Sequence, residues 1–252
     1  MDLLNQTVVI VPLIFLAALL FSSVGHGGAS GYLAVMALLA VAPASMRPAA
    51  LVLNVLVASI ALYNFYKAGA FSWQLFLPLV AASIPFAFLG GKMTLPTQVY
   101  KSVLGAVLLY AAFTLLRDSN KVFVANPVAI KKPVLLGLGA GLGVLSGLTG
   151  IGGGVFLSPI LLFFRWAETK VVSGVAAGFI LANSIAGLIG VMQKSPKLPD
   201  GLIYWAFAAV LGGLIGAEYG SKRLANPAIK KLLAVVLVIA AVKMMIDGFN
   251  YA

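Results

Sequence analysis

Two glycine-rich clusters hold the residue types best suited to binding a ligand in this chain. The candidates that they contribute are Gly25, His26, Gly27 and Gly28 in the first cluster and Gly150, Gly152, Gly153 and Gly154 in the second. Each glycine weakens a continuous helix by about 1 kcal/mol relative to alanine, so we expect the helices to break here. A helix that begins after such a break presents unpaired N–H groups and the positive end of its dipole, which bind anions. The clusters therefore predict an anion site, with close helix packing through small residues as the alternative.

Four polar side chains in or beside apolar stretches are candidates for the same site. His26 lies inside the first cluster, where its imidazole could donate to an oxyanion, titrate in proton coupling, or bond a nearby carbonyl. Asn54, Asn183 and Ser184 lie inside apolar runs, where an amide or hydroxyl is costly unless it finds a partner. Such side chains either bind substrate or hold two helices together, and the sequence leaves both alternatives open.

Residue counts exclude several kinds of chemistry. The chain has no cysteine and one histidine, which excludes disulfides, thiolate metal sites, iron–sulfur clusters and multi-histidine metal centres. We therefore expect no metal site and no cofactor. The stretch Gly28-Ala29-Ser30-Gly31 is similar to the serine motif of rhomboid intramembrane proteases, but that dyad needs a histidine on a later helix, and His26 precedes the serine. We expect no enzymatic activity.

The composition indicates a polytopic membrane protein. Of the 252 residues, 62% are hydrophobic and 9% are charged, whereas soluble domains average about 45–50% apolar and about 25% charged residues. The net charge of +11 does not predict nucleic-acid binding, because the basic residues lie in short loops and form no stripe with aromatic residues. The expected surroundings are a lipid bilayer, with no sizeable soluble domain.

Turn signals divide the chain into about ten apolar segments, or about eight full spans. The segments fall roughly at 8–24, 28–44, 49–66, 72–91, 98–116, 134–149, 153–166, 171–192, 201–219 and 228–246. A membrane-spanning helix needs about 20 apolar residues, and the runs at 28–44 and 153–166 fall short of this length. Each short run follows a glycine cluster, which predicts helices that are interrupted in the membrane or re-entrant.

The basic residues favour one orientation in the membrane. With the N-terminus outside, the outer loops contain Arg47, Lys92, Lys101, Lys194 and Lys197. The inner loops then contain the larger set, namely Lys67, Arg117, Lys121, Lys131, Lys132, Arg165, Lys170, Lys222, Arg223, Lys230 and Lys231. Cytoplasmic loops carry the excess of lysine and arginine, so we expect both termini on the outer side of the membrane.

The two halves of the chain resemble each other. Residues 25–29 match residues 150–154, Ser59 aligns with Ser184, and Lys92 aligns with Lys222. We expect a first repeat over residues 1–120, a connecting loop over 121–133 and a second repeat over 134–252, in a single integral membrane domain. Because five segments per repeat is an odd number, the second copy must enter the membrane upside down. The predicted fold is all-α and polytopic, with two inverted repeats, as in many secondary transporters.

The second cluster also carries a family resemblance. Thr149-Gly150-Ile151-Gly152-Gly153-Gly154-Val155-Phe156-Leu157-Ser158-Pro159, the pair Ser173-Gly174 and the five-segment repeat resemble the sulfite exporter TauE/SafE family, also called the TSUP transporters. The resemblance covers nearly the full chain. It implies a protein of the bacterial inner membrane, with its termini on the periplasmic side, that transports a small sulfur-containing anion such as sulfite, thiosulfate, sulfoacetate or another organosulfonate. The first cluster departs from the family pattern because it has His26 where Ile151 stands in the second.

The sequence and the resemblance together predict a secondary transporter that works by alternating access around a midplane site. Export is favoured over import because an inside-negative potential drives anions outward, although proton coupling could reverse the direction. An anion channel with the same fold is the alternative. The substrate, the coupling ion and any homo-oligomeric state stay open at this stage.

Overall fold

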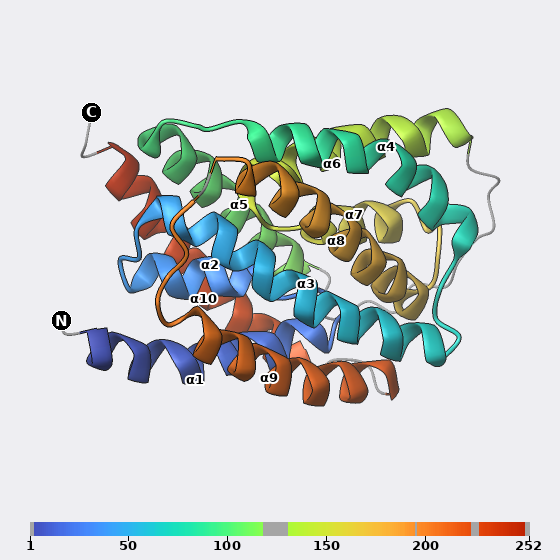
Figure 1. Ribbon diagram of the computed structural model, residues 1–252. Coiled ribbons are helices and arrows are strands. Elements are labelled where there is room, and N and C mark those ends of the chain that lie inside the picture. Colours follow the sequence, from blue (N-terminus) through green and yellow to red (C-terminus); the bar gives the residue numbers. More distant parts are fainter. Residues whose placement is uncertain (1–2, 118–130, 195, 223–226, 250–252) are drawn as a thin grey trace.

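The fold consists of ten α-helices in the parts of the chain that the structure describes (Figure 1). The structure is a computed structural model that describes residues 3–117, 131–194, 196–222 and 227–249. The helices are α1 (Leu3–Ser22), α2 (Ala29–Leu38), α3 (Pro43–Lys67), α4 (Trp73–Lys92), α5 (Thr97–Arg117), α6 (Lys132–Thr149), α7 (Gly154–Phe163), α8 (Thr169–Met192), α9 (Leu202–Lys222) and α10 (Pro227–Phe249). No strand occurs within these ranges, and the predicted all-α class is confirmed.

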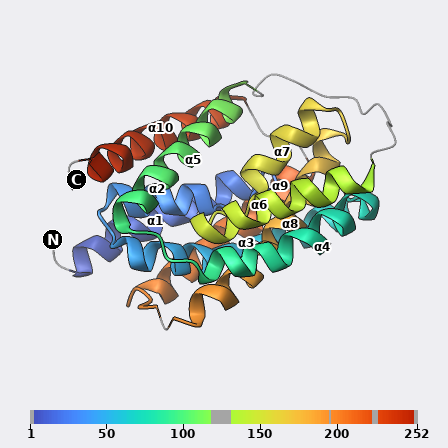
Figure 2. The ribbon, with the colours of Figure 1, turned by 90° about the horizontal axis from the view of Figure 1, so that it is seen from above.

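Most helices run along one direction of the bundle, and α1 begins at the same end where α10 finishes (Figures 1 and 2). Two hydrogen bonds mark this end. Lys101, near the start of α5, donates to the Asp247 carbonyl of α10, and Lys243 of α10 donates to the Leu38 carbonyl at the end of α2. We call this the terminal end of the bundle. The opposite end, where α3 finishes and α8 begins, is called the far end.

The helices α2 and α7 are half-length and occupy opposite halves of the bundle (Figures 1 and 2). Each has ten residues, about 15 Å of helix against a hydrocarbon core of about 30 Å. Helix α2 starts beside Asn54, near the middle of α3, and reaches the terminal end. Helix α7 also starts near Asn54 and reaches the far end, where Arg117 at the end of α5 lies 5.6 Å from the Phe163 ring. The two short apolar runs are therefore half-helices whose N-termini meet in the middle.

Rows of glycine allow two pairs of helices to pack with their backbones in contact. Any Cβ added at one of these glycines would collide with a backbone carbonyl of the partner helix, so only glycine fits. In the α4–α6 pair the contacts join Gly139 with Leu79, Gly143 with Ser83 and Gly147 with Ala87. In the α1–α9 pair they join Gly212 with Phe15, Gly216 with Leu19 and Gly220 with Ser23.

The helix pairing has the pattern of a repeat. Helix α1 packs on α9 and α6 packs on α4, while α3 packs on α8 and α5 packs on α10. Shifting every helix by five places along the chain converts the α1–α9 pair into the α6–α4 pair. The same shift converts the α3–α8 and α5–α10 pairs into themselves. This pattern supports the repeat predicted from the sequence, while the inverted relation of the two halves and the domain boundaries stay predictions. Residues 121–130 of the predicted connecting loop lie outside the described residues.

Several helices have the length and composition to cross a membrane. Among the described residues, α3, α4, α6, α8 and α9 meet both criteria, and shorter apolar helices cover Val8–Ser22, Ala29–Leu38 and Gly154–Phe163. The outward faces of these helices carry large apolar side chains such as Leu77, Phe207 and Leu211. A surface of this kind is stable in lipid rather than in water. The multi-pass membrane prediction is therefore confirmed.

Candidate anion-binding site

The chain is interrupted twice near the middle of the bundle, and both interruptions have left-handed glycines at two equivalent positions. In the first break, residues 23–28, Gly25 and Gly28 have φ angles of 75° and 100°. In the second break, residues 150–153, Gly150 and Gly153 have φ angles of 81°. These left-handed conformations strain any residue that carries a Cβ atom. Each break therefore uses glycine to turn the chain back before a new helix starts.

The first turns of α2 and α7 leave backbone N–H groups without partners inside their own helices. In α2 the first hydrogen bond of the helix runs from the Tyr32 N–H to the Gly28 carbonyl. In α7 the N–H groups of Phe156 and Leu157 both donate to the Gly153 carbonyl. The N–H groups that precede these bonds are left for another acceptor, and both helix dipoles point their positive ends at the same region. The arrangement can hold a negative charge.

Asn54 connects the two breaks. Its Oδ1 accepts a hydrogen bond of 3.0 Å from the Ala29 N–H, the first N–H of α2. Its Nδ2 lies 3.2 Å from the Ile151 carbonyl oxygen in the second break and 3.3 Å from Ser184 Oγ on α8. The side chain is fully buried. One amide thus caps one half-helix and holds the chain that leads into the other.

Asn183 precedes Ser184 on α8. Unlike Asn54 and Ser184, it forms no side-chain hydrogen bond among the described residues. It is fully buried, and neither its Nδ2 nor its Oδ1 has a partner among the described residues. A buried amide without partners costs about 1–3 kcal/mol. Unpaired buried polar groups in native proteins call for a reason such as a bound ligand or water. Asn183 is therefore the predicted site residue whose hydrogen-bonding capacity is unused.

His26 links the first break to the second half-helix. Its Nε2 lies 3.0 Å from the Ser158 Oγ of α7, which is 7% exposed. The residues are 132 positions apart. The contact brings an imidazole from one break alongside the half-helix that follows the other, near the charge-binding region.

The contacts around the breaks show which positions of the two halves are equivalent. A Cβ at Gly27 would meet Asn54, Ile180 and Ala58, and a Cβ at Gly152 would meet Ile180, Asn54 and Ser184. Asn54 therefore corresponds to Ile180, and Ala58 rather than Ser59 corresponds to Ser184. The exposed Ser59 bonds a carbonyl of its own helix. The asparagines 54 and 183 are not equivalent residues.

The predicted site residues are brought together in part. Gly27, Asn54, Gly152 and Ser184 lie within contact of one another, and Gly25, Gly28, Gly150 and Gly153 form the turns around them. Gly154 is the first residue of α7 and packs against Ile180. Asn183 makes no hydrogen bond to this group. The sequence alone did not point to Ser158 or Ile180, because an ordinary serine or isoleucine in an apolar helix carries no signal.

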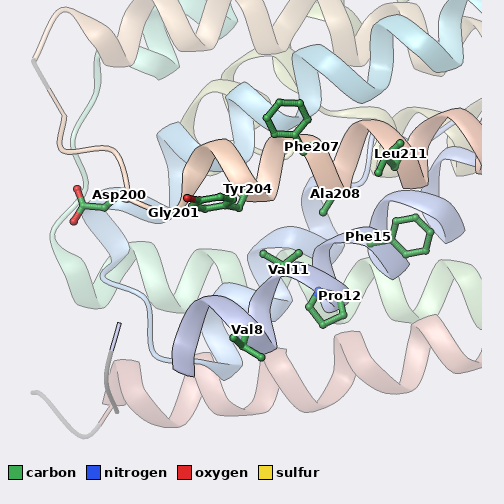
Figure 3. Close-up of a pocket in the computed structure, with 10 residues that line it drawn as sticks. All are labelled: Val8, Val11, Pro12, Phe15, Asp200, Gly201, Tyr204, Phe207, Ala208 and Leu211. Atoms are coloured by element: carbon green, nitrogen blue, oxygen red, sulfur yellow. The ribbon is translucent and has the colours of Figure 1, made fainter. Parts of the chain in front are cut away.

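A large groove lies elsewhere in the structure. It has a volume of about 840 Å³ and lies between the beginnings of α1 and α9, lined by apolar side chains such as Val11, Phe15 and Phe207 (Figure 3). Asp200 stands at one end of this groove. An open apolar groove with a carboxylate suits lipid tails better than an anion. We therefore place no anion site there.

Comparisons with known proteins agree on the kind of protein. The model of the sulfite exporter TauE/SafE family matches residues 10–244. The chain is 38% identical over 234 residues to a probable membrane transporter protein of Sinorhizobium fredii, covering 92% of this chain and 95% of that protein. It is 25% identical over 148 residues to a probable membrane transporter protein of Methanocaldococcus jannaschii, covering 58% of this chain and 54% of that protein. No solved structure shows a significant match.

Proposed function

Because this chain belongs to the sulfite exporter TauE/SafE family and is a multi-pass membrane transporter, we propose that it carries a small sulfur-containing anion. Sulfite, sulfoacetate and related organosulfonates are the proposed substrates. The family name supports the sulfur chemistry. The observation that carries the anion assignment is the meeting of two half-helix N-termini at Asn54.

The proposed binding site lies between the two breaks. The unpaired N–H groups at the start of α7 would donate to the oxygens of a sulfonate or sulfite group, and the two helix dipoles would stabilise its charge. Asn183 would add an amide that is free to bond substrate. The site would lie near the bilayer midplane, where inverted-repeat transporters bind their substrates.

The proposed mechanism is alternating access. Asn54 ties α2 to the second break and to α8, so movement of one half of the protein against the other would have to rearrange these bonds. Substrate bound between the breaks would replace bonds that are lost on opening. Two discrete arrangements of this kind would expose the site to one side at a time.

Export is the proposed direction, across a bacterial inner membrane with both termini outside. An inside-negative potential moves each negative charge outward with about 2.3 kcal/mol per 100 mV. Because the chain contains no cysteine, single variants test the orientation directly. With the termini outside, an impermeant thiol reagent applied to intact cells should label Lys197→Cys and spare Lys170→Cys; the reverse pattern would contradict the proposed orientation.

Flux into proteoliposomes tests the function. Vesicles loaded with unlabelled sulfoacetate should take up labelled sulfoacetate from outside, and sulfite should compete. A carrier predicts uptake that saturates and depends on the internal substrate. Uptake that follows the membrane potential without counterflow would identify a channel instead. Transport of cations with no response to sulfur anions would refute the proposal.

A further inference from the structure

A cavity with polar and basic side chains in its lining opens at the terminal end of the bundle. Its volume is about 270 Å³, which at about 30 Å³ for each water corresponds to roughly nine water molecules. It lies where α3 and α5 begin and where α4 and α8 finish. The lining residues are Pro43, Ala44, Arg47, Pro48, Gly91, Thr94, Leu95, Thr97, Tyr100, Val191, Lys194 and Pro196. This lining contains two cationic side chains and no carboxylate.

Arg47 is the unusual member of this lining. Its residue exposure is 9%, although the sequence assigned it to the loop charges. Its guanidinium donates to the carbonyls at the end of α4, from Nη1 to Met93 at 2.8 Å and from Nη2 to Gly90 and Gly91 at 2.7 and 2.6 Å. Its Nε is buried without a partner. The guanidinium thus keeps one unused donor while it is held in place by α4.

The charge of Arg47 has no ionic partner. Within the described parts of the chain, no carboxylate forms a salt bridge with Arg47, whereas Lys222 pairs with Glu218 at the far end. Burial of a charge without a counter-charge is expensive, and the carbonyl groups at the end of α4 offset only part of this cost. A mobile anion in the adjoining cavity would supply the missing negative charge.

Other donors line the same space. Lys194 Nζ lies 3.3 Å from the Thr94 Oγ1 at the rim. The first hydrogen bonds of α3 run from Ser45 and Met46 to the Ala42 carbonyl, so the Ala44 N–H remains for another acceptor. Arg47 and Lys194 thus bring positive charge to the cavity lining, and the start of α3 adds a backbone donor at Ala44.

The cavity adjoins the second break. A Cβ at Gly150 would lie 3.1 Å from Arg47 Cγ, so the arginine packs directly against the break. The hydroxyl of Tyr100 donates to the carbonyl of Thr149, the residue before Gly150, at 3.3 Å. An anion held at Arg47 would therefore lie next to the chain that leads to the start of α7.

The far end has no equivalent of this arginine. Gly25, the counterpart of Gly150, packs against Ser173, whose hydroxyl bonds the Thr169 carbonyl of its own helix. Ser173 is thus the counterpart of Arg47. A buried cation stands beside one break only, which gives the two mouths of the protein different chemistry.

We propose that this cavity is an anion-binding vestibule for a small sulfonate or related oxyanion, with Arg47 and Lys194 as its recognition residues. The sulfur chemistry rests on the proposed function; the anion site itself rests on the largely buried charge of Arg47, which has no carboxylate partner and lies in the cavity lining. The vestibule would hold the anion on its way to or from the site between the breaks.

Thiol modification tests the vestibule on the full-length protein in detergent. Ala44→Cys places a thiol in the cavity lining, and Ala42→Cys places one outside it, two residues away; both positions are exposed. At each thiol, the rate of modification by a sulfonate-bearing methanethiosulfonate is divided by the rate for its trimethylammonium counterpart. This ratio should be at least 5-fold higher at Ala44→Cys than at Ala42→Cys. Saturating sulfoacetate should slow the reaction at Ala44→Cys at least 5-fold, and acetate at equal ionic strength should not.

Charge-removing variants identify the residues responsible. In the Ala44→Cys background, Arg47→Gln should abolish both the charge preference and the protection. Because Arg47 also holds the end of α4, Lys194→Gln serves as a second variant at an exposed position and should reduce protection 2- to 3-fold. Lys197→Gln removes an equal charge from the same loop outside the lining and should leave protection unchanged.

The outcomes separate the vestibule from the transport proposal. Equal reagent preference at the two thiols, no protection by sulfoacetate, or full protection in both Arg47→Gln and Lys194→Gln would overturn the vestibule. Sulfoacetate flux in proteoliposomes without protection would leave the transport proposal standing and the vestibule refuted. Protection without flux of any sulfur anion would support the anion site and refute the transport proposal.

Discussion

The two breaks have left-handed glycines at two equivalent positions and differ in the side chains around them. Left-handed glycines stand at Gly25 and Gly28 in the first break and at equivalent positions in the second. A left-handed residue, Ala40 or Arg165, also follows each half-helix, with φ angles of 56° and 55°. Around this common frame, the first break is capped by Asn54, whereas the equivalent position beside the second break is Ile180.

This difference indicates a division of roles. The first half-helix has its leading N–H satisfied by a protein amide, so its position is held by the protein itself. The second half-helix, α7, has Ile180 at the equivalent position, and this side chain cannot accept a hydrogen bond. The leading N–H groups of α7 are therefore left for another acceptor such as a ligand. The second break also has the buried cation Arg47 beside it, where the first has Ser173. The repeated backbone thus provides two similar frames, and under the proposed function their different side chains would make one of them structural and leave the other for the substrate.

The largest effect is expected from Asn54→Leu. This variant leaves the Ala29 N–H and the Ile151 carbonyl buried without partners, at about 1–3 kcal/mol for each group. Thermal unfolding should occur at a lower temperature, and flux in proteoliposomes should fall at least 100-fold. Ser59→Ala, which removes a hydroxyl bonded within its own helix, should match the wild type in both measurements. Wild-type flux in Asn54→Leu would show that the bridge between the breaks is dispensable.

Gly152→Ala should have the next largest effect. Gly152 has a φ of 82°, and its added Cβ would lie 2.8 Å from Asn54 Nδ2 and 2.7 Å from Ile180 Cγ2. We expect at least a 10-fold loss of flux. Gly69→Ala is the matched control, because Gly69 has a φ of 71° with nothing within 4 Å of an added Cβ. Gly69→Ala should lower the free energy of unfolding by about 1–2 kcal/mol through backbone strain alone, and its flux should equal that of the wild type. Equal losses in the two variants would mean that strain, and not crowding of the site, is responsible.

Asn183→Leu separates stability from transport. Because the Asn183 amide is buried without partners, an apolar side chain of similar size should raise the free energy of unfolding by about 1–3 kcal/mol. The unfolding temperature should rise by about 2–4 °C for each kcal/mol, while flux falls several-fold if the amide contacts substrate. Asn54→Leu should lower both quantities. A lower unfolding temperature in Asn183→Leu would reveal a structural role for this amide.

The smallest effect is expected for the His26–Ser158 contact. A double-mutant cycle with His26→Ala and Ser158→Ala should give a coupling of about 0.5–1.5 kcal/mol in thermal or chemical unfolding. A cycle that pairs His26→Ala with Ser221→Ala should give none, because Ser221 bonds a carbonyl of its own helix. Zero coupling in the first cycle would show that the contact does not join the first break to α7.

Much of the architecture could be read from residue types and spacing. Short apolar runs behind glycine clusters predicted the two half-helices, because chain length limits what can cross a bilayer and glycine breaks helices. Lys92 and Lys222, which the sequence comparison aligned, are the last residues of α4 and α9. The alignment within the site was less accurate. The link between α7 and α8 is longer by one residue than the link between α2 and α3, and one residue turns a helix by about 100°. Ser59 therefore faces outward, and Ala58 occupies the position equivalent to Ser184.

By itself, the sequence determined the membrane environment, the all-helical class, the two breaks and the polar residues that apolar runs must accommodate. These follow from local properties, namely hydrophobicity, glycine content and segment length. Only the tertiary structure decided that Asn54 spans both breaks, that Asn183 keeps an unused amide, and that Arg47 is buried beside Gly150. Each of these depends on which helix faces lie together, and that is set by close packing between segments far apart in the chain.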